Sequence, residues 1–352
     1  MTKKETPQVI ETEGAATARP RKQHAAHRQL DVPRAQETAA DGLLIIDKPA
    51  GVTSHDVVSC TRRLAATRKV GHAGTLDPMA TGMLIVGVGK ATRLLHYITG
   101  ADKGYFARIS LGISTDTDDA DGEIIAINSI PSARETTLTG EIDAQLGYFR
   151  GDIMQRPTTV SAIKVGGKRA HALHRAGESV ELAARPVTVS VFERLSEVEF
   201  TRIETEGETI TVAEFDVRVE CSSGTYVRAL ARDLGAALGL GGCLTELRRF
   251  RIGNWKPQQM QTIEELGKQV TESGKVQVLP LTEACLNAYD SLELTEAEAI
   301  SLCNGNTTQL KVTNQKTEIV AALYQGQVRA LIQKQDSGFK PLVVFETQMP
   351  KT

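Results

Sequence analysis

The sequence predicts an α+β fold with a mixed, mostly antiparallel sheet and a smaller β-rich module at the C-terminal end. Predicted strands and helices alternate irregularly along the 352 residues, and several predicted strands follow one another directly. A doubly wound parallel sheet would need a regular alternation of strands and helices instead. Apolar residues make up 41% of the chain and charged residues 24%, which is typical of a globular protein with a buried core.

Three regions divide the chain. Residues 1–41 are rich in Thr, Ala, Gln and Pro, with mixed charge and no apolar periodicity, so we expect a disordered tail. Residues 42–280 contain most of the predicted strands and helices and form the main domain. From about Leu281 the pattern changes to one short helix followed by short strands, which indicates a separate module over residues 281–352.

The main domain begins with a short apolar strand at residues 43–46, which ends at the sequence DKPAG. Ser54 is expected to be the N-cap of a helix that continues to about Ala66. Apolar patterns then predict strands at 83–88 and 105–111, a helix at 91–98, an acidic loop at 115–123, a helix at 135–149, strands at 187–192 and 210–219, and a helix at 225–238 that Gly239 ends. In the C-terminal module they predict a helix at 294–303 and strands at 318–323, 327–332 and 342–345.

Charge and cysteine usage narrow the class of protein. The net charge is −2, so any surface that binds nucleic acid must come from local clusters of basic residues. The five cysteines are scattered and never spaced C-x-x-C, which favours reduced thiols in a cytoplasmic protein over a disulfide framework or a zinc site. No apolar run approaches the roughly 20 residues that span a bilayer, so we expect no membrane partner.

One aspartate, Asp77, has an unusual setting. It lies in GHAGTLDPMATG, is followed directly by Pro78, and is the one carboxylate between Val57 and Arg93. The same stretch supplies a set of basic side chains, namely Arg62, Arg63, Arg68, Lys69 and His72. A lone carboxylate beside residues suited to phosphate suggests a nucleophile or base that acts on a nucleic acid. The alternative is a simple turn, because Asp-Pro pairs commonly form turns.

Six segments carry a resemblance to a known family. GHAGTLDPMATG resembles the signature of the TruB family of tRNA pseudouridine synthases, and five further segments match in the same order along the chain. They are DKPAGVTSHD, KGYFARISLGISTDTDDADG, FRGDIMQRPTTVSAIKVGGKRA, CSSGTYVRALARDLGAALG and LRRFRIG. The resemblance covers roughly Gly42 to Trp255. It implies a catalytic domain of the pseudouridine synthase type over residues 42–280 and a PUA-like β-barrel that binds RNA over residues 281–352.

The resemblance also implies the reaction. Enzymes of this family isomerise uridine to pseudouridine in the TΨC loop of tRNA, at position 55, after flipping the base out of its stack. The reaction breaks the N-glycosidic bond and rejoins the base through carbon, so it needs no metal or other cofactor. We expect the TΨC stem-loop of tRNA as the partner of a monomeric enzyme.

The resemblance assigns roles to individual residues. Asp77 matches the catalytic aspartate, and Arg228 matches the arginine that keeps this carboxylate ionised and aimed. Tyr105 matches the tyrosine that stacks on the target base and that could serve in the later proton removal. Leu247 matches a residue that lines the uracil pocket. Without the motifs, Arg228 would be taken for an exposed helix arginine and Leu247 for a core residue, and Tyr105 could equally be a core residue.

Other matched residues are expected to bind RNA. His72 matches a histidine that contacts displaced nucleotides, and Lys48 supports either its own motif or the phosphate backbone. Residues 153–177 contain no carboxylate and five basic residues, and a second basic cluster lies at residues 248–251. From these two clusters we expect phosphate contacts from Lys164, Lys168, Arg169 and Arg248. Where many relatives have tyrosine, this chain has Val160 and His171, which affects stacking near the pocket.

Two other functions fit parts of the pattern. An RNA-binding or chaperone-like protein could unfold and release tRNA without catalysis. A guide-RNA-dependent relative of the dyskerin type would also carry the signature. The chain lacks an extended C-terminal region and has a TruB-like insertion before Ser161, which favours an enzyme that acts without guide RNA.

Overall fold

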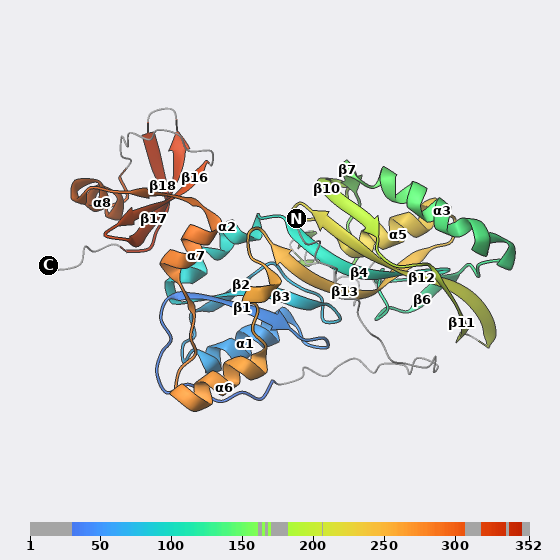
Figure 1. The fold of residues 1–352 in the computed structure, drawn as a ribbon, viewed down its shortest axis with the longest axis horizontal. Helices are drawn as coiled ribbons and strands as arrows, with labels where there is room; N and C mark the ends of the chain where they lie inside the picture. Colours follow the sequence, from blue (N-terminus) through green and yellow to red (C-terminus); the bar gives the residue numbers. More distant parts are fainter. Residues whose placement is uncertain are drawn as a thin grey trace, which may run out of the picture.

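The computed structural model describes residues 30–160, 164–165, 168–169, 182–205, 207–306, 318–335 and 338–346. Most of its strands join one ten-stranded sheet, while a four-stranded sheet stands at one end of the molecule (Figure 1). The helices are α1 (Ser54–Leu64), η1 (Gly89–Arg93), α2 (Leu95–Thr99), α3 (Ser132–Tyr148), α5 (Val227–Ala237), η2 (Pro257–Gln259), α6 (Ile263–Ser273), α7 (Leu281–Ala288) and α8 (Glu296–Cys303).

The large sheet is mixed and mostly antiparallel, which confirms the predicted fold class. Its order is β14-β1-β3-β13-β4-β12-β10-β7, with β2 added on β3 and β11 on β12, and its one parallel pair is β13 with β3. Its strands are β1 (Gly42–Lys48), β2 (Val70–Ala73), β3 (Thr81–Val88), β4 (Lys103–Leu111), β7 (Gly151–Gln155), β10 (Arg185–Arg194), β11 (Glu199–Thr205), β12 (Glu208–Cys221), β13 (Gly242–Ile252) and β14 (Leu279–Pro280). Two small hairpins pair β5 (Ile113–Thr115) with β6 (Ile124–Ile127) and β8 (Lys164–Val165) with β9 (Lys168–Arg169).

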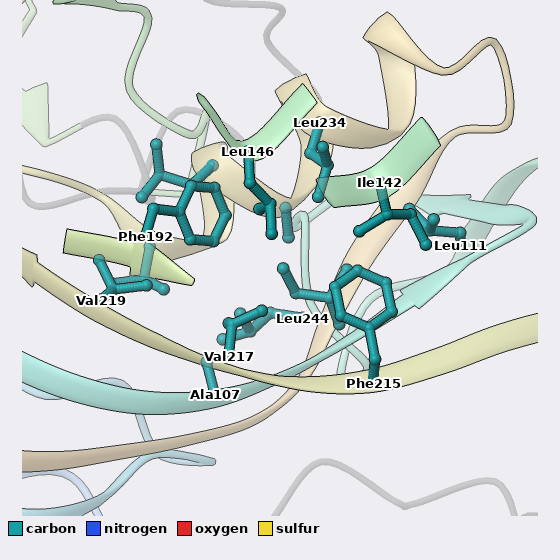
Figure 2. Close-up of a cluster of buried hydrophobic side chains, with 14 of the residues drawn as sticks. Ala107, Leu111, Ile142, Leu146, Phe192, Phe215, Val217, Val219, Leu234 and Leu244 are labelled. Atoms are coloured by element: carbon teal, nitrogen blue, oxygen red, sulfur yellow. The ribbon is translucent and has the colours of Figure 1, made fainter. Parts of the chain in front are cut away.

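Helices α3 and α5 cover the strands at the centre of the sheet. Leucine and isoleucine recur every four residues along α3, so they share one face of the helix. Figure 2 shows Ile142 and Leu146 of α3 and Leu234 of α5 pointing toward Phe215 and Val217 of β12. This buried cluster extends to Tyr105 and Leu247, so the core that holds the sheet together also supports two candidate site residues.

Strand β13 was not predicted, although it lies between β3 and β4. Its register places Leu247 opposite Ala107 of β4 and Arg249 opposite Gly82 of β3. A Cβ atom on Gly82 would lie 2.3 Å from the carbonyl oxygen of Arg249, and Gly82 has a φ of +94°. Only glycine fits this close approach without strain. The last glycine of the signature therefore lets β13 pack beside it.

Several boundaries differ from the predicted ones, and two of them concern helices at the start of the main domain. The N-cap of α1 is Thr53, which forms a capping box with Asp56, while the Ser54 hydroxyl bonds elsewhere. The helix expected at 91–98 is divided into η1 and α2.

The expected tail is not disordered over its whole length. In the part that the structure describes, Val32 and Ala35 are buried against α1 and α6. The side chain of Arg63 donates two hydrogen bonds to the carbonyl oxygen of Val32, at 3.1 and 2.9 Å. Residues 32–35 therefore pack against the main domain, because two apolar residues without periodicity are enough to anchor an extended segment.

The C-terminal strands form a second, smaller sheet. They are β15 (Asp290–Glu293), β16 (Ile319–Tyr324), β17 (Gln327–Gln335) and β18 (Gly338–Val344), paired in that order. In the described part of this module no pairing closes the sheet, so the predicted β-barrel is not confirmed. A shared apolar cluster joins Leu331 of β17 to Trp255 and Leu94 of the main domain, and Lys90 forms an ion pair with Glu346.

Candidate active site

The signature loop between β2 and β3 holds Asp77 on a rigid backbone. The hydroxyl of Ser54 accepts a hydrogen bond from the amide of Leu76 at 2.9 Å and donates to its carbonyl oxygen at 3.2 Å. On the other side, the amide of Gly51 donates to the carbonyl oxygen of Pro78 at 2.8 Å. Both neighbours of Asp77 are thus fixed by the matched segment DKPAGVTSHD, which explains why the two motifs occur together.

Arg228 pairs with Asp77, as the resemblance implied. Its Nε lies 3.0 Å from Oδ2 of Asp77, and its Nη1 lies 3.0 Å from Oδ2 of a second carboxylate, Asp119. The side chain of Asp77 is 36% exposed, whereas those of Arg228 and Asp119 are 5% and 6% exposed. Asp77, the more exposed carboxylate, is therefore held by the buried guanidinium of Arg228. The buried carboxylate of Asp119 in turn holds Arg228.

The guanidinium of Arg228 also bonds two backbone carbonyls. Nη1 donates to Thr117 at 2.7 Å and Nη2 donates to Val160 at 2.9 Å. An arginine fork can serve four acceptors in one plane, which a lysine ammonium cannot. Arg228 thus ties the acidic loop and the start of the insertion to Asp77. Residue 160 takes part through its backbone carbonyl oxygen, so this contact does not depend on its side chain.

Asp119 was not among the predicted site residues. It belongs to the acidic loop TDTDDADG, where four aspartates stand close together and no pattern separates one from the others. Burial raises the pKa of Asp119, and the positive charge of Arg228 opposes this rise. The hydroxyl of Thr117 donates to its Oδ1 at 2.6 Å, which fixes the carboxylate further.

Tyr105 and Leu247 form an apolar wall beside the signature loop. Each is 8% exposed, and both belong to one buried cluster with Leu76 and Ala80 of that loop. Arg249 lies directly opposite Tyr105 in the register of β13 with β4. Burial raises the pKa of Tyr105 above its ordinary value of 10, although Arg249 lowers it in part.

The comparisons with known proteins place this site in a family. The family model for the TruB family pseudouridylate synthase (N terminal domain) matches residues 62–227, and the one for the tRNA pseudouridylate synthase B C-terminal domain matches residues 228–289. Proteins named tRNA pseudouridine synthase B are 52% identical in an Arthrobacter species, over 75% of this chain and 81% of that protein, and 46% identical in Thermobifida fusca, over 87% and 99%. The chain belongs to the TruB family.

Solved structures agree on the fold. A chain of an H/ACA RNP bound to a substrate RNA containing 2′-deoxyuridine superposes with a TM-score of 0.61 at 22% identity, covering 88% of this chain and 85% of that one. An archaeal box H/ACA sRNP Nop10-Cbf5 complex gives a TM-score of 0.60 at 22% identity, over 87% and 86%. At this identity the likeness supports the architecture of the TruB-family sheet and no more.

His72 lies on β2 as a neutral, half-buried ring. Burial lowers its pKa to about 4, and the charges of His55 and Arg249 act in the same direction. The ring meets that of His55 edge-on, with the centroids 5.6 Å apart. At neutral pH the imidazole carries no charge, so it is suited to contact a base and unsuited to bind a phosphate.

The position of Lys48 does not agree with the prediction that its side chain binds the substrate. Its side chain is fully buried, and Nζ donates to the carbonyl oxygens of Pro49, Val52 and Pro78 at 2.9, 2.7 and 3.3 Å. Burial lowers its pKa to about 8, while the nearby charge of Asp77 opposes that shift. All three ammonium protons are thus used inside the protein, which makes Lys48 a support for the signature loop.

The arginines of the basic cluster at residues 248–251 also form hydrogen bonds and ion pairs within the protein. Arg248 forms a two-pronged ion pair with Asp47, at 2.9 and 2.7 Å. Arg251 pairs with Glu220 at 2.6 Å, and Arg249 is 1% exposed. The pair with Asp47 uses two of the five N–H donors of Arg248, so the expected phosphate contact of Arg248 stays a prediction.

The remaining expected residues lie in the insertion between β7 and β10. The structure describes the backbone of Lys164, Lys168 and Arg169 in the short hairpin of β8 and β9, and their side chains lie outside the description. His171 lies outside the described residues as well. The phosphate contacts of this insertion stay predictions.

Two features are absent from the described residues of this TruB-family chain. No group of three or more His, Cys, Asp or Glu side chains is placed to hold a metal ion. No helix is long and apolar enough to cross a membrane. All five cysteines are buried free thiols, and burial raises the pKa of Cys60 and Cys285 to about 12.

Proposed function

We propose that this protein isomerises uridine to pseudouridine at position 55 in the TΨC loop of tRNA. Membership of the TruB family supports the reaction and the tRNA substrate. The observation that carries the proposal is the exposed carboxylate of Asp77, which Arg228 and the two bonded neighbours in its loop hold in one orientation. A fixed, solvent-facing carboxylate is what attack on a flipped nucleotide requires.

The chemistry assigns Asp77 one of two roles. As a nucleophile, its oxygen adds to the base or the sugar and helps to break the bond between N1 and C1′. As a base, it removes a sugar proton and the same bond breaks by elimination. In either case the detached uracil turns and its C5 joins C1′; the bond to Asp77 then breaks in the first route, and the removed proton returns to the sugar in the second. The proton at C5 leaves and N1 gains one, so the overall change is an isomerisation.

Tyr105 and Leu247 are proposed to enclose the flipped uracil. Their position beside Leu76 of the signature loop brings an aromatic face and an apolar side chain next to Asp77. Stacking on an aromatic side chain contributes about 1–3 kcal/mol per base, which offsets the few kcal/mol that unstacking costs. His72, neutral and close to the same loop, is proposed to contact nucleotides displaced by the flip.

The other proposals concern the context of the reaction. We expect a catalytic domain over residues 42–280, a PUA-like RNA-binding module over residues 281–352, and a monomer that acts in the cytoplasm without cofactor or guide RNA. The C-terminal family model ends at residue 289, and the small sheet begins at Asp290, which is consistent with a module at that end of the chain.

The test uses unmodified tRNA transcript and purified protein, with pseudouridine mapped by carbodiimide treatment and primer extension. We expect one stop in the TΨC loop. Asp77→Asn should slow product formation at least about 10,000-fold, or about 5.5 kcal/mol of barrier, because the carboxylate itself reacts. Binding of tRNA should be largely kept.

The matched control is Asp143→Asn. Asp143 also pairs with an arginine, Arg194, at 2.8 Å, but it lies on the surface helix α3 with 49% of its side chain exposed. Its activity should equal that of the unmodified protein, because an exposed pair contributes at most about 1 kcal/mol. Product formation by Asp77→Asn would contradict the assignment of Asp77. Tight tRNA binding without any product would favour the RNA-chaperone function instead.

A further inference from the structure

Arg232 is a half-buried arginine of helix α5 to which the proposed reaction assigns no role. It follows Arg228 by four residues, so the two side chains leave the same face of the helix one turn apart. Nη1 of Arg232 lies 3.0 Å from Oδ2 of Asp118, and the two side chains are 28% and 11% exposed. Asp118 directly precedes Asp119, which Arg228 holds in the same way. Two arginines one turn apart thus bind two consecutive aspartates of the acidic loop.

Both arginines also reach the chain that follows β7. Nη2 of Arg232 donates to the carbonyl oxygen of Arg156 at 2.7 Å, as Nη2 of Arg228 donates to that of Val160 at 2.9 Å. Nε of Arg232 donates to Oδ1 of Asp233 at 2.8 Å. Each of the three nitrogens of this guanidinium therefore has an acceptor within the protein, and its position is fixed as that of Arg228 is.

Three carboxylates share two guanidinium groups at this site. The carboxylates are those of Asp77, Asp118 and Asp119, and the guanidinium groups are those of Arg228 and Arg232. Burial raises the pKa of Asp118, and the positive charges of Arg232 and Arg228 oppose that rise. Arg228 therefore already acts on Asp118 at a distance, although its own ion pairs are with the two other aspartates.

We propose that Arg232 is a positioning residue for this reaction, which neutralises Asp118 and thereby keeps Arg228 on Asp77. The proposal rests on the proposed function. Without Arg232 the buried carboxylate of Asp118 would lack its counter-ion, which is strongly destabilising, and Arg228 would turn toward it. The side chain of Asp119 is 6% exposed, whereas that of Asp77 is 36% exposed. Water can replace the guanidinium at Asp77 alone, so that contact is the one that Arg228 gives up.

Arg232→Gln tests the role of the charge. The amide keeps an N–H donor for the carbonyl oxygen of Arg156 and removes the positive charge beside Asp118. Single-turnover formation of pseudouridine at saturating enzyme should slow about 10- to 50-fold, because the carboxylate of Asp77 loses its fixed orientation. The Kd for tRNA, measured by filter binding, should stay within about twofold. At saturating enzyme the rate constant does not depend on the fraction of folded protein, so a purely structural role of Arg232 would leave it unchanged.

The decisive variant combines Arg232→Gln with Asp118→Asn. When residue 118 carries no charge, nothing draws Arg228 away from Asp77, so the rate should return to within about threefold of the unmodified protein. This double variant buries no unpaired carboxylate, so it also serves if Arg232→Gln alone does not fold. Arg232→Lys keeps the charge and loses the planar fork, and its rate should likewise stay within about threefold.

Arg134→Gln is the matched control. The side chain of Arg134 is 29% exposed, close to the value for Arg232. It also joins a carboxylate to a backbone carbonyl oxygen, since Nη2 lies 2.7 Å from Oε2 of Glu141 and donates to the carbonyl oxygen of Leu238 at 2.8 Å. These partners lie on α3 and at the C-terminal end of α5, so the single-turnover rate should equal that of the unmodified protein.

Three results would overturn the assignment. A double variant as slow as Arg232→Gln would mean that Arg232 acts through its bonds to Arg156 and Asp233, and a lysine variant as slow as the glutamine variant would mean the same. An unchanged rate constant in Arg232→Gln would mean that Arg232 contributes only to stability. If the unmodified protein forms no pseudouridine, the proposed function itself fails and this proposal falls with it, which is a different outcome from a slow variant of an active enzyme.

Discussion

Lowering the pH from about 7 to about 5 should destabilise this protein through His72. The ring lies on β2 beside the signature loop, and its Nδ1 is buried with no hydrogen-bond partner in the described part of the chain. Burial, His55 and Arg249 together lower the pKa of His72 from 6.5 to about 4. A proton on this ring would place a second positive charge beside a buried guanidinium, with nothing to accept the new N–H.

The size of the effect follows from the two pKa values. The folded-state pKa is depressed below the unfolded one, so the unfolded chain binds more protons between pH 6.5 and pH 4. Stability is therefore complete above about pH 6.5 and is lost as the pH falls toward 4. At pH 5 the loss amounts to about 2 kcal/mol, and below pH 4 it levels off at about 3 kcal/mol.

Urea unfolding at about pH 7, 6 and 5 measures this loss. The unmodified protein should lose about 2 kcal/mol more between pH 7 and pH 5 than His72→Gln, which has no proton to bind in this range. His96→Gln, on the exposed side of α2, is the control and should follow the unmodified protein. If the unmodified protein and His72→Gln lose the same free energy of unfolding, the reasoning from the buried ring is refuted.

Three further substitutions test the frame around Asp77. Arg228→Lys cannot serve two carboxylates and two carbonyls, so single-turnover rates should fall about 100- to 1,000-fold while filter binding of tRNA stays within about twofold. Asp119→Asn leaves the buried Arg228 with one counter-ion, and urea melts should show a loss of about 3 kcal/mol; unchanged stability would argue against a buried pair. Lys48→Met removes three hydrogen bonds and should destabilise the protein by about 2–3 kcal/mol without weakening tRNA binding, whereas weaker binding with unchanged stability would restore the phosphate role.

Elements with a single clear period could be predicted from the sequence. Helix α3 and strand β12 have apolar residues at helical or alternating spacing, and both occur where they were expected. Strand β13 was missed because charged residues interrupt its alternation: Glu246, Arg248, Arg249 and Arg251. Its burial depends on partners from other segments, such as Asp47 for Arg248, and no local pattern contains them.

The roles of basic residues were the least predictable part of the site. A run of arginines near a signature motif is typical of a surface that contacts phosphate. In the folded chain Lys48 holds three carbonyl oxygens, Arg248 holds Asp47, and Arg249 holds the carbonyl oxygens of Met83 and Gly74. A positive charge has the same appearance in the sequence whether its partner is a phosphate or a carbonyl oxygen.

The sequence by itself determined the family and the reaction that follows from it, and it predicted Asp77 as the catalytic residue, because these depend on residue types at fixed spacing within one short segment. Only the tertiary structure decided which side chains surround Asp77. Arg228 reaches both Asp77 and Asp119, and Arg249 reaches both the signature loop and β3. Hydrogen bonds and ion pairs depend on distances of about 3 Å between segments far apart in the chain, and sheet register and burial set those distances.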